Sequence, residues 1–331
     1  MKTPELQTRH MAVELLSAVV RKGKGLEEEF ARMMDEQDKI SPLDGRDRMF
    51  VRLLATTTLR RLGQIDALLK RFLAKPLPDK AAYVTDVLRI AAAQTVFLDT
   101  PPHAAVSTAV SLVKDSLFKG FAGLTNAVLH KVARDGAKIA AGQDAAKLNI
   151  PDWLLRQWRA EYGADAAEKI ALAGLEEAPL DFTVKADAKQ WAEKLESIVM
   201  PTGTLRREKS ASVPSLPGFE DGAWWVQDLS AALPAALFGD LRGKKAADVC
   251  AAPGGKTAQM VLRGADVTAV DISANRVKRL KENLGRLKLP VKVVVSDARV
   301  WAEKEQKASY DAILLDAPCS ATGTLRRHPD V

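Results

Sequence analysis

The stretch that decides the fold of the second half of the chain is Asp248-Val-Cys-Ala-Ala-Pro-Gly-Gly-Lys-Thr257. A short β-rich run leads into a glycine turn, and a helical pattern follows the turn. In a parallel α/β sheet, this arrangement aims backbone N–H groups and a helix N-terminus at a ligand. The segment therefore predicts a ligand-binding loop, the alternative being a plain structural turn.

Two common phosphate-binding motifs do not match this loop. A nucleoside-triphosphatase loop has a glycine five positions before its final Gly-Lys-Thr, and Cys250 stands at that position. A dinucleotide fingerprint needs the spacing G-x-G-x-x-G, which Pro253-Gly254-Gly255 lacks. Both of these ligand classes are therefore excluded at this loop.

The residues around the loop have an alternating α/β pattern. β-rich runs at 246–249, 267–270, 291–295 and 312–315 alternate with helical segments, of which the clearest are 255–263 and 273–288. Such alternation predicts parallel strands joined by crossover helices. Four strands are fewer than a doubly wound sheet usually has, so we expect the chain to be a fragment of a longer protein.

Carboxylates follow three of these strands. Asp271 ends the second run, where an acidic side chain accepts hydrogen bonds from ribose hydroxyls, although Asp-Ile-Ser273 is equally a plain helix cap. Asp297 follows the third run, at a position suited to an adenine amino group. Because the carboxyl ends of parallel strands share one edge, these residues predict a nucleoside-bearing ligand above the sheet.

The fourth run ends in Leu315-Asp316-Ala-Pro-Cys-Ser-Ala-Thr-Gly323. A cysteine beside a proline at a strand end is expected to be exposed, the alternative being a small buried apolar residue. A thiolate that adds to carbon 6 of cytosine makes carbon 5 nucleophilic towards an electrophilic methyl group. Asp316 is suitably spaced to hydrogen-bond the base and favour protonation of N3. Arg326 and Arg327 follow as candidate phosphate contacts.

Residues 1–142 predict an all-α bundle. Met11, Leu15, Leu16 and Val19 recur at helical spacing, and further helices are expected over the ranges 79–98, 103–117 and 124–141. Ser41-Pro42 is interpreted as the cap and first-turn proline of another helix. Cations on these helices favour salt-dependent contacts with phosphates, and the candidates are Arg60, Arg61, Lys70 and Arg71.

Residues 143–222 predict a small α/β connector, and residues 223–331 the α/β domain described above. The connector contains two helices up to residue 177, one strand at 181–185, a short helix around Trp191 and a polar stretch that ends at Gly222. The expected organisation is therefore three domains: 1–142, 143–222 and 223–331.

Composition limits the class of protein. The 331 residues carry a net charge of +7, with 23 Lys and Arg against 17 Asp and Glu in residues 1–150, 9 against 13 in 151–222, and 17 against 12 in 223–331. Two basic blocks suit a polyanionic partner, and an ordinary solvated surface is the equally weighted alternative. Two cysteines, four histidines and no long apolar run predict a cytoplasmic protein without disulfides, metal or membrane span, expected to be a monomer.

Together, the motifs resemble those of the S-adenosylmethionine-dependent RNA cytosine-5 methyltransferases. The matching positions are Cys250-Ala-Ala-Pro-Gly-Gly-Lys256, Asp271, Asp297 and Asp316-Ala-Pro-Cys319, and Gln227-Asp-Leu-Ser230 resembles the segment before the first motif. In the first half of the chain, three segments resemble the helical domain of the antitermination factor NusB. They are Leu88-Arg-Ile-Ala-Ala-Ala-Gln-Thr-Val-Phe-Leu-Asp99, Pro102-His-Ala-Ala-Val106 and Asn126-Ala-Val-Leu129. A NusB-like domain before such a methyltransferase domain is the layout of the RsmB (Sun/Fmu) family, which acts on small-subunit ribosomal RNA.

This resemblance implies a NusB-like RNA-binding bundle, a connector and a Rossmann-like methyltransferase domain that modifies carbon 5 of a cytosine in 16S ribosomal RNA. The alternative is an RNA-binding scaffold with a non-catalytic methyltransferase-like half. Asp316 and Cys319 are then the catalytic candidates. The implied contacts of S-adenosylmethionine are Cys250, Ala251, Ala252, Pro253, Gly254, Gly255, Lys256, Asp271, Asp297 and Asp316.

The chain departs from the family pattern in one respect. The attacking cysteine of the family is expected in a Thr-Cys segment on a later strand, and no cysteine follows Cys319 in the 331 residues. We therefore expect the main nucleophile to be missing from this sequence and Cys319 to assist release of the methylated base. The alternative is that Cys319 itself attacks, as the Pro-Cys thiol does in DNA cytosine methyltransferases.

Overall fold

The computed structural model describes residues 4–40, 43–208, 211–305 and 309–330. Contacts divide the chain into two compact units: a helical unit, Met1–Glu177 with Ala321–Val331, and an α/β unit, Ala178–Ser320. The domain boundaries expected after residues 142 and 222 stay predictions. In the part of the chain that the structure describes, every helix is too short or too polar to cross a bilayer.

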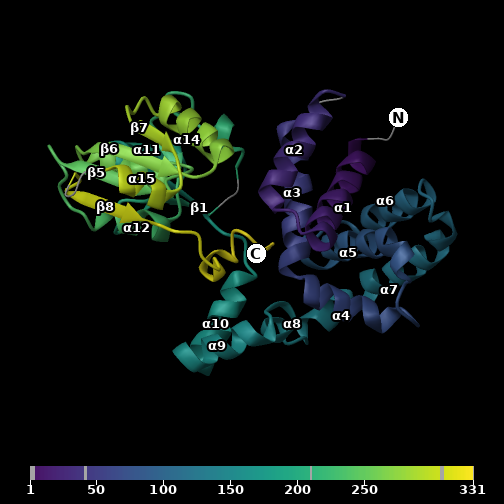
Figure 1. Cartoon of the computed structure of the whole chain (residues 1–331). Coiled ribbons are helices and arrows are strands. Elements are labelled where there is room, and N and C mark those ends of the chain that lie inside the picture. Colours follow the sequence, from purple (N-terminus) through teal and green to yellow (C-terminus); the bar gives the residue numbers. More distant parts are fainter. Residues whose placement is uncertain (1–3, 41–42, 209–210, 306–308, 331) are drawn as a thin grey trace. The chain divides into compact units, whose positions relative to one another are not determined.

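The helical unit begins with a succession of helices (Figure 1). They are α1 (Pro4–Lys22), α2 (Leu26–Asp38), α3 (Gly45–Arg60), α4 (Leu62–Phe72), η1 (Asp79–Ala81), α5 (Ala82–Phe97), α6 (Pro102–Lys114), η2 (Lys119–Phe121), α7 (Ala122–Ala141), α8 (Ala145–Asn149), α9 (Asp152–Tyr162) and α10 (Ala164–Gly174). The short η4 (Thr322–Thr324), near the end of the sequence, belongs to the same unit. The predicted all-α architecture is confirmed.

One apolar core holds α1 to α7 together. It contains the predicted stripe of α1, and Leu15 and Leu16 are fully buried there against side chains such as Leu54 and Leu88. The predicted cap at Ser41-Pro42 lies outside the described residues. The helix α3 itself begins at Gly45, where the side chain of Asp44 accepts a hydrogen bond from the backbone N–H of Asp47 at 2.7 Å.

The α/β unit contains two four-stranded sheets. The first, of order β2-β3-β1-β4, is antiparallel in every pair. Its strands are β1 (Leu180–Val184), β2 (Ile198–Val199), β3 (Leu205–Arg207) and β4 (Trp224–Val226), and the connecting segments contain α11 (Ala188–Lys194) and η3 (Val213–Ser215). Only β1 was predicted, because strands of two or three residues are too short to show alternation.

The second sheet, of order β7-β6-β5-β8, is parallel throughout, as the alternating pattern predicts. Its strands are β5 (Lys245–Val249), β6 (Asp266–Asp271), β7 (Lys292–Val295) and β8 (Ala312–Leu315). The helices around it are α12 (Leu229–Ala236), α13 (Gly255–Leu262), α14 (Ala274–Arg286) and α15 (Ala298–Lys304). Leu280, Leu284 and Leu287 form the buried face of α14 and its end, and they pack against Trp225 and Ala252.

Candidate active site

The candidate site lies at the edge of the second sheet where its strands end. The strands β5 to β8 are parallel (Figure 1), so their carboxyl ends lie along one edge. The predicted motif residues follow directly after these ends. The structure thus brings four of the predicted features to the same edge: the 250–256 loop, Asp271, Asp297 and Asp316.

The loop between β5 and α13 has a tight backbone. Cys250 has a φ of 65° and Gly254 a φ of 104°, both in the left-handed region. A Cβ atom at Gly254 would lie 3.4 Å from Cγ of Leu280. The backbone N–H of Gly254 donates to the carbonyl of Ala251 at 2.8 Å. The helix α13 then begins at Gly255. Its first backbone N–H groups therefore lie at the sheet edge, where they suit a polar or anionic ligand group.

Two side chains of α14 hold this loop, and sequence analysis did not single out either. Nη2 of Arg276 donates to the carbonyl of Ala252 at 2.6 Å, and Nδ2 of Asn283 donates to the carbonyl of Pro253 at 2.9 Å. Both are polar residues on a helix that follows a motif strand, which is too common a pattern to identify them. They fix two carbonyls of the loop and so keep its N–H groups oriented.

Asp271 is buried at the end of β6, with its side chain 1% exposed. Its carboxylate accepts hydrogen bonds from the backbone N–H groups of Ala252 at 3.1 Å and Ser273 at 3.0 Å, and Arg276 lies 3.3 Å away. It therefore connects the end of β6 to the loop after β5 and to the start of α14. A carboxylate can accept about four hydrogen bonds, so these contacts and a further one to a ribose hydroxyl are chemically compatible. The ribose contact itself stays a prediction.

A second buried carboxylate, Asp248, links the strand before the loop to the helix after it. Asp248 is 1% exposed and accepts a 2.5 Å hydrogen bond from Oγ1 of Thr257. Burial raises the pKa of Asp248 to about 6, although the Thr257 hydroxyl acts in the opposite direction. This contact joins β5 to the first turn of α13.

Gln227, in the segment before the first motif, completes the support of α13. Its Oε1 accepts a hydrogen bond from Nε1 of Trp225 at 2.9 Å, and its Nε2 donates to Oε1 of Gln259 at 2.8 Å. A Cβ atom at Gly255 would lie 3.4 Å from this Gln227 side chain. Gln227 thus contacts the helix start through polar atoms, and no spacing rule would have predicted its partners.

Asp297 caps the N-terminus of α15. Its carboxylate accepts the backbone N–H of Arg299 at 2.8 Å and forms an ion pair with the Arg299 guanidinium at 3.0 Å. These contacts, the side-chain hydrogen bond foremost, lower the pKa of Asp297 to about 2. The carboxylate is therefore charged at neutral pH, and its contact with adenine stays a prediction.

A salt bridge to Lys256 connects Asp316, which follows β8, to the 250–256 loop. Nζ of Lys256 lies 2.7 Å from the Asp316 carboxylate, with the lysine side chain 17% and the aspartate side chain 57% exposed. Cys319 is exposed, as predicted. Cys250 is half-buried, and burial, with a smaller effect from the charge of Asp271, raises the pKa of its thiol. Cys319 is thus the more accessible of the two thiols.

Three of the arginines expected to contact phosphates, Arg60, Arg61 and Arg326, have partners within the helical unit. Nη2 of Arg326 donates to the carbonyl of Glu177 at 2.8 Å, and Nη2 of Arg60 donates to the carbonyl of Arg326 at 3.0 Å. Arg61 lies over the ring of Phe97, 5.2 Å from its centroid. Burial lowers the pKa values of Arg60 and Arg61. Three of the predicted cations therefore hold the helical unit together.

The other two predicted cations of the bundle, Lys70 and Arg71, are exposed. They lie at the end of α4, where cations are favoured by the helix dipole. Their role in RNA binding stays a prediction.

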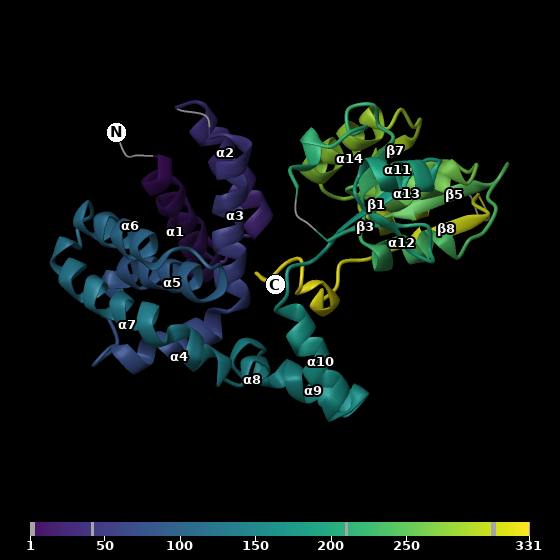
Figure 2. The same cartoon turned by 180° about the vertical axis from the view of Figure 1, so that it is seen from behind.

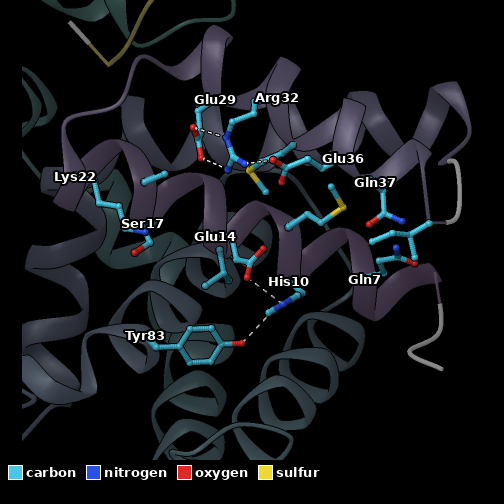
Figure 3. Close-up of a pocket in the computed structure, with 15 residues that line it drawn as sticks. Gln7, His10, Glu14, Ser17, Lys22, Glu29, Arg32, Glu36, Gln37 and Tyr83 are labelled. Atoms are coloured by element: carbon cyan, nitrogen blue, oxygen red, sulfur yellow. Dashed lines mark hydrogen bonds and ion pairs between the residues drawn. The ribbon is translucent and has the colours of Figure 1, made fainter.

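A cavity of about 930 Å³ in the helical unit contains none of the motif residues (Figure 3). It lies between α1 and α2. Its acidic groups have partners: Arg32 contacts both Glu29 and Glu36 at 2.5 Å, and Nε2 of His10 lies 3.3 Å from the Glu14 carboxylate. The arrangement does not point to an anionic ligand.

Two known families match separate parts of the chain. Residues 6–134 match the model of the NusB family, and residues 241–331 match that of the 16S rRNA methyltransferase RsmB/F family. The chain is 35% identical to the ribosomal RNA small subunit methyltransferase B of Xylella fastidiosa strain Temecula1, over 98% of this chain and 75% of that protein. It is 33% identical to the protein of the same name from Cronobacter sakazakii, over 98% and 78%.

The fold is also similar to a solved structure. The crystal structure of PH0851 superposes on all of this chain and on 77% of its own, with a TM-score of 0.74 and 19% sequence identity. At that identity the likeness concerns the fold alone. It agrees with the predicted order of a helical bundle followed by a Rossmann-like α/β domain.

Proposed function

Because the chain belongs to the 16S rRNA methyltransferase RsmB/F family, we propose that it methylates carbon 5 of a cytosine in 16S ribosomal RNA, with S-adenosylmethionine as the methyl donor. The observation that carries this proposal is the convergence of the glycine loop with Asp271, Asp297 and Asp316 at one sheet edge. The names of the similar proteins support ribosomal RNA as the substrate.

The residues at this edge fit the proposed cofactor. The left-handed Gly254 keeps side-chain atoms out of the turn, so the N–H groups that begin α13 are accessible to a carboxylate or a similar polar group. Asp271 and Asp297 supply acceptors of the kind that ribose hydroxyls and an adenine amino group need. When bound, the cofactor supplies an electrophilic methyl group.

The proposed chemistry at the base begins with a cysteine thiolate. A bond from its Sγ to carbon 6 would raise the electron density at carbon 5, so that carbon 5 could accept the methyl group that S-adenosylmethionine would supply, with S-adenosylhomocysteine as the leaving group. Asp316 hydrogen-bonds the base and favours a proton on N3 as negative charge develops there. A base then takes the proton from carbon 5, the electron pair of that C–H bond re-forms the carbon 5–carbon 6 double bond, and the thiolate leaves carbon 6, which frees the methylated cytosine.

We assign Cys319 to the last of these steps. It is exposed and follows Asp316 by three residues, so it lies near the proposed base position without being part of the cofactor loop. Lys256, 2.7 Å from Asp316, orients that carboxylate. The attacking thiol is then the Thr-Cys cysteine that the family resemblance implies.

Bisulfite mapping of 16S ribosomal RNA tests the overall proposal. In RNA from cells that carry the gene, we expect a cytosine that resists conversion, and this resistance should vanish when the gene is deleted and return when it is restored. An unchanged map would refute cytosine-5 methylation. RNA binding without methyl transfer would support the scaffold alternative.

The Cys319→Ala variant tests the release step in the enzyme made from its complete gene. We expect the variant to accumulate a covalent protein–RNA adduct, visible as a slower band on a denaturing gel, because attack on carbon 6 remains and release is impaired. The exposed neighbour provides a control, since Ser320→Ala should give no such band. Loss of both adduct and product in Cys319→Ala would instead make Cys319 the attacking nucleophile.

A further inference from the structure

The helix α14 carries an unusual concentration of positive charge. Residues 273–292 contain seven Lys and Arg and a single acidic residue, Glu282. The apolar side of α14 is buried against the sheet, so most of these cations face solvent. The helix lies beside β7 in both views of the molecule (Figures 1 and 2).

The three lysines on α14 and at its C-terminal end have no partner within the described residues. Lys278, Lys281 and Lys288 are exposed, and no salt bridge or side-chain hydrogen bond joins them to another described residue. Their neighbours Arg276 and Arg286 differ in this respect: Arg276 contacts Asp271, and Arg286 donates to two backbone carbonyls of the unit. The cations of α14 thus divide into those that hold the fold and those available to a ligand.

Lys288 occupies a position where glycine is the favoured residue. It follows the end of α14 with a φ of 53°. Its N–H donates to the carbonyl of Gly285 at 2.9 Å, and the N–H of Leu289 donates to that of Leu284 at 3.0 Å. This is the Schellman arrangement, in which glycine is favoured over a residue with a side chain at the left-handed position. The charge of Lys288 is therefore held at a conformational cost.

Other cations surround this end of the helix. Nζ of Lys185, which follows β1, donates to the carbonyl of Leu287, adjacent to Lys288. Burial lowers the pKa of Lys185, and the charges of Lys288 and Arg286 lower it further. A phosphate near these side chains would relieve the repulsion between them.

We propose that Lys278, Lys281 and Lys288 form a phosphate-contacting surface for the RNA substrate. The inference rests on the proposed function, which identifies the polyanion as RNA. It also follows from placement: α14 begins three residues after Asp271 at the candidate site and runs away from that edge for 13 residues, or about 20 Å. RNA whose cytosine reaches the site can therefore place neighbouring phosphates along this helix.

The test compares two triple variants that remove the same charge from the α/β unit. One is Lys278→Ala/Lys281→Ala/Lys288→Ala, and the control replaces three other exposed lysines, Lys189→Ala/Lys245→Ala/Lys304→Ala. Affinity for in vitro transcribed 16S ribosomal RNA is measured between about 50 and 200 mM salt. We expect the α14 variant to bind about ten- to a hundredfold more weakly, with a log–log salt slope shallower by about 2 to 3, because three phosphate contacts are lost. The control should keep the wild-type slope.

A single variant separates binding from folding. Lys288→Gly removes one charge at a position that favours glycine, so the Tm should equal or exceed that of the wild type while RNA affinity falls about fivefold. Equal losses in the two triple variants, or an unchanged RNA affinity of Lys288→Gly, would overturn the proposed surface. An enzyme made from its complete gene that binds RNA but transfers no methyl group would refute the catalytic proposal and leave this surface standing.

Discussion

At the residue scale, two buried carboxylates hold the 250–256 loop and the helix that follows it through different contacts. Asp271 joins the end of β6 to the loop and to α14 through backbone N–H groups and Arg276. Asp248 contacts Thr257 and connects β5 to α13. Buried carboxylates need such partners, because an unsatisfied polar group in the interior costs several kcal/mol. Their protonation and removal therefore have measurable consequences.

Stability should depend on pH through Asp248. Its pKa is about 6 in the folded chain and near 4 when unfolded, so the folded state binds the proton more tightly between these values. Folding stability should therefore fall by about 3 kcal/mol in total as the pH rises from about 3 to about 7, with most of the loss between the two pKa values. Asp248→Asn lacks this dependence. Urea unfolding of both proteins at a series of pH values gives the difference, and parallel curves would contradict the shift.

Asp271→Ala should weaken binding of S-adenosylmethionine. Loss of the proposed ribose contacts costs about 1–3 kcal/mol of binding free energy, and the loop also loses its hydrogen bond at Ala252. Calorimetric titration measures the change. Asp266→Ala, at the exposed opposite end of β6, is the matched control and should bind normally. Unchanged affinity of Asp271→Ala would remove this residue from the cofactor site.

At the element scale, close helix packing in the bundle depends on a missing side chain. Gly63, in the first turn of α4, would place a Cβ atom 1.7 Å from the carbonyl oxygen of Leu148 in α8. By contrast, a Cβ atom added to Gly123, near the start of α7, would have no neighbouring atom within 4 Å. The two glycines therefore separate the effect of contact from that of helix propensity.

Gly63→Ala should destabilise the helical unit. Alanine favours a helix by about 1 kcal/mol over glycine, but the overlap with a backbone oxygen forces α4 and α8 apart and costs about 1–3 kcal/mol more than that gain. Gly123→Ala should stabilise by up to about 1 kcal/mol. Thermal unfolding of both variants checks the pair. A Gly63→Ala protein as stable as Gly123→Ala would show that α8 moves without cost.

At the scale of the whole molecule, the segment that begins at Ala321, shortly after Cys319, belongs to the helical unit. Leu325 packs against the apolar cluster of α8 to α10, and the Asp330 carboxylate accepts the backbone N–H of Leu26 at 2.9 Å. Arg60 contributes two hydrogen bonds to the carbonyl of Arg326. The chain thus passes from the proposed catalytic motif directly into an anchored segment.

Arg60→Ala should loosen this segment. The substitution removes both hydrogen bonds to the carbonyl of Arg326. Local unfolding of the segment that contains Arg326 then costs less free energy. Trypsin should then cleave after Arg326 or Arg327 several times faster than in the wild type, as followed by mass spectrometry. Lys70→Ala, which removes an exposed cation from the same unit, should leave the rate unchanged. Equal rates in both variants would show that Arg60 does not anchor the segment.

The local features of this protein were determined by its sequence. The helices of the bundle, the four parallel strands and the turn at Gly254 depend on the period of apolar residues and on backbone conformation, which act over a few residues. The shared edge of Asp271, Asp297 and Asp316 also follows from these patterns, because parallel strands end on the same side.

Only the tertiary structure decided which charges hold the fold and which face solvent. Arg60 and the carbonyl it contacts are 266 residues apart in the chain, and no local pattern distinguishes this arginine from Lys278. The partners of Asp271 in the 250–256 loop and the two- and three-residue strands of the first sheet were likewise decided there. The physical reason is the same in each case: the energy of a long-range contact depends on where packing brings two distant segments, and neither segment alone contains that information.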